Sequence, residues 1–268
     1  MSSQPSEQRG RTDQPSVLCL LGDLRIEWDE QMARVPEGSK RLLVLLALHP
    51  GRWLERRWAA GVLWPNGNDD RAVGNLRSAI WRLRGSGLYL IDADKICIRL
   101  SDHVAVDVTA VDAWAGRIID GSAGDVDRRI HPGSVDAVDL LPGWYDDWVI
   151  MPRERLRHRV LHALETLSRA LSCQDCHNEA VDAAILAVQV EPFRDSAQRA
   201  LISAHLREGN WIEARRSCQL YIDLLRLELG IDPPADLADF MSRPWQFALP
   251  PRRPGLRLEQ PIASTAAV

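Results

Sequence analysis

The chain has 268 residues, which predicts about two domains, and its 46% hydrophobic and 26% charged residues are typical of a globular protein. Its longest hydrophobic run, 42–48, has seven residues against the ~20 of a membrane-spanning helix, and the polar first sixteen residues contain no secretory signal. We therefore expect a cytoplasmic protein without membrane contact, and five cysteines are too few for a disulfide framework.

Charge differs between the two halves of the chain. The net charge of −4 divides into +2 over residues 1–104 and −6 over residues 105–268. The segment 71–99 carries a local charge of +4, and 31 of the 33 basic residues are arginine. Arginine suits phosphate and guanine edges, but a GC-rich coding bias would produce the same excess.

The first hundred residues predict a winged helix-turn-helix. Short alternating or apolar runs predict strands, and stretches bounded by glycine, proline or acidic residues predict helices. The expected strands are 17–21, 24–27, 32–35, 88–91 and 96–100, and the expected helices are 40–48, 54–63 and 71–84. The last two strands form a hairpin with a turn at 92–95, and strands, three helices and a hairpin are the outline of this fold.

The third helix separates into two faces. A period of about 100° per residue places one apolar stripe against the other helices, made of Val73, Leu76, Ile80 and Leu83. The opposite face combines cations, an amide, a hydroxyl and an indole: Arg71, Gly74, Asn75, Arg77, Ser78, Trp81 and Arg82. Such a face can contact phosphates and base edges, although a solvated face would also carry arginines. An outward Trp81 favours a partner.

The second half of the chain is expected to be all helical. Helices are predicted at 106–119, 153–171, 178–190, 194–207 and 211–229, with a loop over 121–139. Pro152 is expected at a helix start and Gly230 at a helix end. Similar residues recur 34 apart: Leu167 with Leu201, Ala170 with Ala204, Glu179 with Glu213 and Ala180 with Ala214. This is the tetratricopeptide period, and it predicts either a surface for a protein partner or a plain packing module.

Nothing in the sequence predicts an enzyme, a cofactor or a metal site. Cys173, Cys176 and His177 match the pattern of c-type haem attachment, but we interpret them as a structural turn because haem attachment takes place outside the cytoplasm. Zinc at these residues lacks a fourth ligand. The chain has no phosphate-binding loop and no nucleophile elbow.

Four segments resemble the Streptomyces antibiotic regulatory proteins. Residues 69–84 (DDRAVGNLRSAIWRLR) resemble the recognition helix of that family. Residues 140–148 (LLPGWYDDW), 153–157 (RERLR) and 228–233 (ELGIDP) resemble its bacterial transcriptional activator domain. The resemblance extends over residues 17–241 with both domains in the family's order.

The resemblance implies a mainly α fold with a small β component. An OmpR-like winged helix-turn-helix DNA-binding domain (16–104) would precede an all-α, tetratricopeptide-like activator domain (105–243), with a disordered tail at 1–15 and a flexible tail at 244–268. Members bind direct repeats in double-stranded DNA, recruit RNA polymerase holoenzyme and activate antibiotic gene clusters, and a head-to-tail homodimer on DNA would fit direct repeats. The expected base-reading residues are Arg71, Asn75, Arg77, Ser78 and Trp81, and the expected phosphate and wing contacts are Arg82, Arg84, Lys95 and Arg99.

Two departures from the family pattern bear on function. Leu54 stands where members have a Ser or Thr that opens the second helix, so we expect that helix to lack a side-chain cap. The chain also ends at Val268, before the ATPase domain of longer relatives, so we expect a small member without a nucleotide switch. The alternative functions are a protein–protein adaptor, in which the winged helix is a scaffold, and a redox protein that uses the Cys173 pair.

Overall fold

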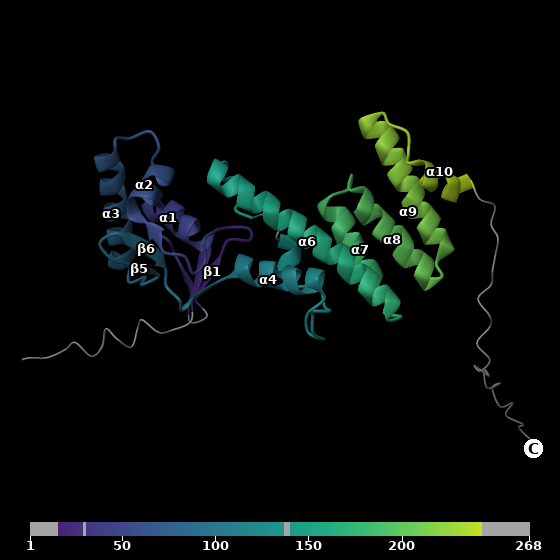
Figure 1. The fold of residues 1–268 in the computed structure, drawn as a ribbon, viewed down its shortest axis with the longest axis horizontal. Helices are drawn as coiled ribbons and strands as arrows, with labels where there is room; N and C mark the ends of the chain where they lie inside the picture. Colours follow the sequence, from purple (N-terminus) through teal and green to yellow (C-terminus); the bar gives the residue numbers. More distant parts are fainter. Residues whose placement is uncertain (1–15, 29–30, 137–139, 243–268) are drawn as a thin grey trace, which may run out of the picture.

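Figure 1 shows an elongated molecule whose strands and first three helices lie at one end and whose later helices extend to the other. This computed structural model describes residues 16–28, 31–136 and 140–242. The two predicted tails therefore lie outside the described residues. Within the described part of the chain, no helix is both long and apolar enough to span a membrane.

A four-stranded sheet opens the fold. Its strands are β1 (Ser16–Cys19), β2 (Arg25–Trp28), β3 (Gln31–Ala33) and β7 (Val104–Val106), in the order β3-β2-β1-β7. β1 pairs antiparallel with β2 and parallel with β7. The predicted turn between β1 and β2 contains Gly22 with φ +76°, a conformation that glycine adopts without strain.

Three helices and a second sheet follow. They are α1 (Glu37–Ala47), α2 (Arg56–Leu63) and α3 (Asp69–Gly85), with β4 (Leu54–Glu55), β5 (Ile91–Ala93) and β6 (Cys97–Leu100) in the order β4-β6-β5. The prediction that α2 begins at Leu54 was wrong. Leu54 is buried and pairs with Ile98 across the sheet, so the helix starts two residues later. The predicted hairpin is confirmed, but its first strand is displaced to Ile91–Ala93 instead of 88–91, and its turn lies at 94–96.

The start of α1 also differs from the prediction. Gly38 and Ser39 were expected to precede the helix, but α1 begins at Glu37 and includes both. Ser39 is buried, and its hydroxyl donates a 2.8 Å hydrogen bond to the carbonyl of Ala79 in α3. A serine that satisfies its hydroxyl on another helix can sit inside a helix rather than at its cap.

The apolar stripe of α3 is confirmed. Leu76, Ile80 and Leu83 are buried, whereas Val73 lies half-buried at the edge of the stripe. Ala72 and Ala79 are buried beside them. Burial of this stripe against α1 and α2 fixes which side of α3 faces outward.

The remainder of the chain is helical. Its elements are α4 (Asp107–Asp120), α5 (Gly133–Asp136), α6 (Asp147–Cys173), α7 (His177–Val190), α8 (Asp195–Glu208), α9 (Trp211–Leu224), a π-helical turn η2 (Leu225–Leu229) and α10 (Ala235–Ser242). α6 packs against α4, α7 and α8, and each of α7, α8 and α9 packs against the next along the chain. Gly230 ends η2 with φ +64°, as predicted for a left-handed helix end.

Pro152 lies inside a helix rather than at its start. α6 begins at Asp147, five residues before the proline. Proline donates no backbone hydrogen bond, so near this end of the helix it removes one bond, to the carbonyl of Trp148. The segment before α6 is held by Arg153, whose guanidinium donates to the carbonyls of Leu140, Leu141 and Trp144 at 2.6–3.0 Å.

The 34-residue repeat is only partly visible in packing. Leu167 and Leu201 are both buried, and so are Ala180 and Ala214. Ala204 is buried but its counterpart Ala170 is exposed, so that pair does not mark equivalent helix contacts. Two of the three predicted apolar pairs therefore occupy equivalent core positions.

The sheet and the helices are joined through a shared core. The Asp107 carboxylate accepts hydrogen bonds of 2.9–3.0 Å from the backbone amides of Leu20 and Leu21. Leu21 also forms a β-bridge with Leu140, and one continuous cluster of buried residues extends from Leu18 to Ala204. This joint ties the end of β1 to the start of α4 and to the segment before α6.

Two tryptophans lie at this joint. Trp148 is in the first turn of α6, and Trp144 precedes the helix rather than sharing a helical face with it. Their rings meet edge to face with centroids 6.4 Å apart, and both pack against the shared core. This packing makes the pair part of the core at the start of α6.

Candidate nucleic-acid interface

The outward side of α3 carries exposed arginines and an exposed tryptophan. Asn68 caps the helix by accepting a 2.9 Å hydrogen bond from the amide of Arg71, and Asp69 and Asp70 occupy the first turn, where acidic side chains stabilise a helix. Of the contact residues predicted on this helix, Asn75 is half-buried. The other six are exposed: Arg71, Arg77, Ser78, Trp81, Arg82 and Arg84.

The centre of this face contains Gly74, Ser78 and Trp81. The indole of Trp81 is 75% exposed, and among the described residues it has no hydrogen-bond or ring partner. The hydroxyl of Ser78 donates to the carbonyl of Gly74 at 3.1 Å, which leaves its oxygen lone pairs directed outward as acceptors. A Cβ placed on Gly74 would meet nothing within 4 Å, so nothing within the described molecule requires a glycine there.

Arg82 and Arg84 lie toward the end of α3. A Cβ on Gly38 would collide with the Arg82 guanidinium, so Arg82 lies against the first turn of α1. Arg84 is exposed in the last turn of α3, where a cation also complements the helix dipole. These two arginines therefore border the α3 face on different sides.

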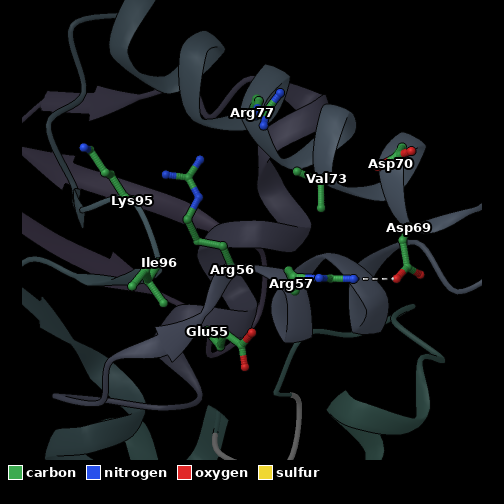
Figure 2. A pocket seen from close by; sticks show the side chains of 9 residues that line it. All are labelled: Glu55, Arg56, Arg57, Asp69, Asp70, Val73, Arg77, Lys95 and Ile96. Atoms are coloured by element: carbon green, nitrogen blue, oxygen red, sulfur yellow. Dashed lines mark hydrogen bonds and ion pairs between the residues drawn. The ribbon is translucent and has the colours of Figure 1, made fainter.

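A hollow of about 520 Å³ lies between the start of α2, α3 and the hairpin turn (Figure 2). It is lined by Glu55, Arg56, Arg57, Asp69, Asp70, Val73, Arg77, Lys95 and Ile96. Asp69 pairs with Arg57 at 3.0 Å, so its charge is matched within the fold. Lys95 is exposed at the turn and has no ion-pair partner among the described residues. The hollow therefore brings the predicted residues Arg77 and Lys95 together.

Arg56 is a residue that the sequence analysis did not identify. Its guanidinium donates to the carbonyl of Asp94 at 2.8 Å, and its backbone amide donates to the carbonyl of Ile96 at 2.8 Å. In Figure 2 it lies between Lys95 and Arg77. Arg56 is the first residue of α2, and that position could have identified it as a candidate contact. It was missed because the helix was predicted to begin at Leu54.

The start of α2 is tied to the hairpin rather than capped by a side chain. As predicted, no side-chain cap is present, because Glu55 stands at the capping position without such a bond. The hairpin turn is held by Asp94, whose carboxylate accepts from the amides of Ile96 and Cys97 at 2.7 and 2.6 Å. These two bonds lower the pKa of Asp94.

Arg99 is separated from the other predicted contacts. Its side chain is 21% exposed and forms ion pairs with Asp92 at 3.0 Å and Asp102 at 2.8 Å. It also lies over the ring of Trp53, 4.8 Å from its centroid. The two carboxylates and the indole hold this guanidinium against the hairpin, whereas Lys95 is exposed and has no ion-pair partner among the described residues.

The cysteine motif lies where α6 ends and α7 begins. Cys173 is exposed and Cys176 half-buried in the turn between α6 and α7, and both are free thiols. No group of three or more potential metal ligands is present in residues 16–28, 31–136 and 140–242.

The comparisons with known proteins match this architecture. Residues 104–243 match the family model of the bacterial transcriptional activator domain. The regulatory protein AfsR of Streptomyces griseus is 28% identical over 242 residues, which are 84% of this chain and 24% of AfsR, so the chain spans about a quarter of that relative. The solved structure of Mycobacterium tuberculosis EmbR, in complex with a low-affinity phosphopeptide, aligns with a TM-score of 0.54 and 17% identity over 86% of this chain and 65% of that one. The last likeness is one of fold.

Proposed function

The chain belongs to the Streptomyces antibiotic regulatory protein family, with its bacterial transcriptional activator domain, and from this premise we propose that it activates transcription by binding double-stranded DNA through α3 and the hairpin turn. Membership makes the chain a transcriptional regulator. The observation that carries the DNA-binding proposal is the outward face of α3, where Trp81 and three arginines surround an unobstructed glycine.

The residues divide by the kind of contact they can make. Arg71, Asn75, Arg77, Ser78 and Trp81 are proposed to read bases, because α3 presents them from its outward face and its two borders. Arg82, Arg84, Lys95 and the newly identified Arg56 are proposed to contact phosphates. Arg99 is left out of the interface because Asp92 and Asp102 already hold it.

The helical part of the chain is proposed to serve assembly on the promoter. Residues 16–104 would bind direct repeats, and residues 105–243 would contact a neighbouring copy and RNA polymerase holoenzyme. Direct repeats require head-to-tail contacts between copies rather than a two-fold interface. By its family the target would be an antibiotic gene cluster in the bacterial cytoplasm, and no catalytic step or cofactor is needed.

The test is footprinting of the purified chain on the DNA upstream of neighbouring genes. Arg77→Ala is expected to weaken binding at the protected site about tenfold, because a guanidinium that contacts guanine contributes ~1–3 kcal/mol of discrimination. Random duplex should lose much less. Arg128→Ala, which removes an exposed arginine after α4, is the matched control. Equal losses on both duplexes would assign Arg77 to phosphate, and no footprint at any upstream region would refute the proposal.

A further inference from the structure

α6 exposes a single line of side chains along its length. Its fully exposed residues, apart from Ala170, follow one another at intervals of three or four: Asp147, Met151, Arg155, His158, His162 and, after the half-exposed Thr166, Arg169 and Cys173. Residues at this spacing lie on the same side of a helix. We call Arg155, His158, His162 and Arg169 the α6 stripe.

The two charged residues of the α6 stripe, Arg155 and Arg169, are both cations in an acidic part of the chain. Residues 105–268 carry a net charge of −6, yet no exposed carboxylate lies on α6 between Arg155 and Arg169. The nearby Glu154 and Glu165 are bound to Arg157 and Arg194. A face that serves only for solubility usually mixes charges of both signs along its length. The arrangement therefore favours an external anionic partner.

The arginines beside the stripe are paired, whereas those on it are not. Arg159 forms a 2.6 Å ion pair with Asp112 of α4, which fixes that border. Within the described part of the chain, Arg155 and Arg169 have no carboxylate partner. Arg169 makes only 3.2 Å contacts to the Glu165 carbonyl and the Thr166 hydroxyl. Two guanidinium groups on the stripe are thus free to pair with carboxylates.

His162 contacts an arginine at the start of α8. The Arg194 guanidinium lies 3.3 Å from Nε2 of His162, and because a guanidinium can only donate, Nε2 is the acceptor in this contact. Arg194 is in turn held by the buried Glu165 at 2.6 Å, and Ser196 donates to the same carboxylate at 2.7 Å. Arg194 and Glu165 therefore link the stripe to the start of α8.

We propose that the α6 stripe docks an acidic segment of a partner protein. From Arg155 to Arg169 the helix rises about 21 Å, which matches about six residues of extended peptide. A duplex is less suitable, because it would extend beyond the stripe over a surface of net negative charge. This interaction goes beyond DNA binding and does not depend on it.

The experiment is fluorescence anisotropy of the full chain with fluorescein-labelled deca-aspartate at low salt, with deca-asparagine as the uncharged probe. Deca-aspartate is expected to bind saturably and deca-asparagine not to bind. Arg155→Gln with Arg169→Gln should weaken binding about five- to tenfold, the sum of two exposed charge pairs. Arg216→Gln with Arg226→Gln removes the same charge from exposed positions of α9 and η2 and should change binding less than about twofold.

Two further measurements make the result decisive. Arg77→Gln should leave peptide binding unchanged, which separates the α6 stripe from the α3 face, and random-duplex binding should be the same with and without the stripe variant. Unchanged peptide affinity in the stripe variant, with a native circular dichroism spectrum, would overturn the proposal. So would a loss of duplex binding as large as the loss of peptide binding. Failure of Arg77→Ala to affect DNA would refute the DNA interface alone.

Discussion

Gly74 offers a direct test of how closely α3 approaches DNA. It is the sixth residue of a 17-residue helix, a position where glycine costs about 0.5–1 kcal/mol relative to alanine. A Cβ there would meet nothing within 4 Å, so Gly74→Ala should gain this free energy without strain. In a protein of this size, the gain corresponds to a rise in Tm of about 1–4 °C.

The same methyl group should impair DNA binding. It would project from the centre of the outward face, beside Ser78 and Trp81, where a recognition helix meets base edges. We expect Gly74→Ala to be more stable in urea unfolding and to lose at least about tenfold in affinity for the footprinted site, or about 1.4 kcal/mol.

Gly61 provides the matched control. It is an exposed glycine inside α2, and an added Cβ there would also meet nothing within 4 Å. Gly61→Ala should raise stability similarly and leave DNA affinity within about twofold, since a methyl group away from the interface changes no contact. If Gly74→Ala binds the site as well as the wild type, the centre of α3 does not approach the bases. If it destabilises the protein, the reasoning about open space is wrong.

Three other predictions follow from particular contacts. Lys95→Ala should reduce the slope of log DNA affinity against log salt concentration by ~0.9, the contribution of one phosphate contact. Arg99→Ala should leave that slope unchanged and lower the free energy of unfolding by about 1 kcal/mol. A reduced slope in the Arg99 variant would return Arg99 to the interface. Asp107→Ala removes the acceptor for the amides of Leu20 and Leu21 and should lower the free energy of unfolding in urea by about 2–3 kcal/mol. A decrease below about 0.5 kcal/mol would show that these hydrogen bonds do not hold the joint. Labelling of the native protein with iodoacetamide should modify the exposed Cys173 first and leave Cys19 unmodified, because burial raises the pKa of the Cys19 thiol to about 11. Rapid alkylation of Cys19, detected by mass spectrometry, would contradict its burial.

Local sequence patterns determined most of the elements. The period of Leu76, Ile80 and Leu83 was enough to place α3 and its outward face, because burial of an amphipathic helix depends on spacing along one segment. Gly230 marked the end of η2 for a similarly local reason, since glycine adopts a left-handed conformation without strain. The family was also recognisable from short motifs.

Tertiary structure decided what those patterns left open. Leu54 belongs to a strand because Ile98, 44 positions later, pairs with it, and no local periodicity encodes that partner. The same pairing brings the hairpin to the start of α2 and turns Arg56 into a candidate contact. Arg99 looked equivalent to Lys95 in sequence, yet Asp92 and Asp102 hold it within the fold. The availability of a charged side chain depends on which opposite charges the fold brings within hydrogen-bonding distance, and those distances arise only when remote segments pack together.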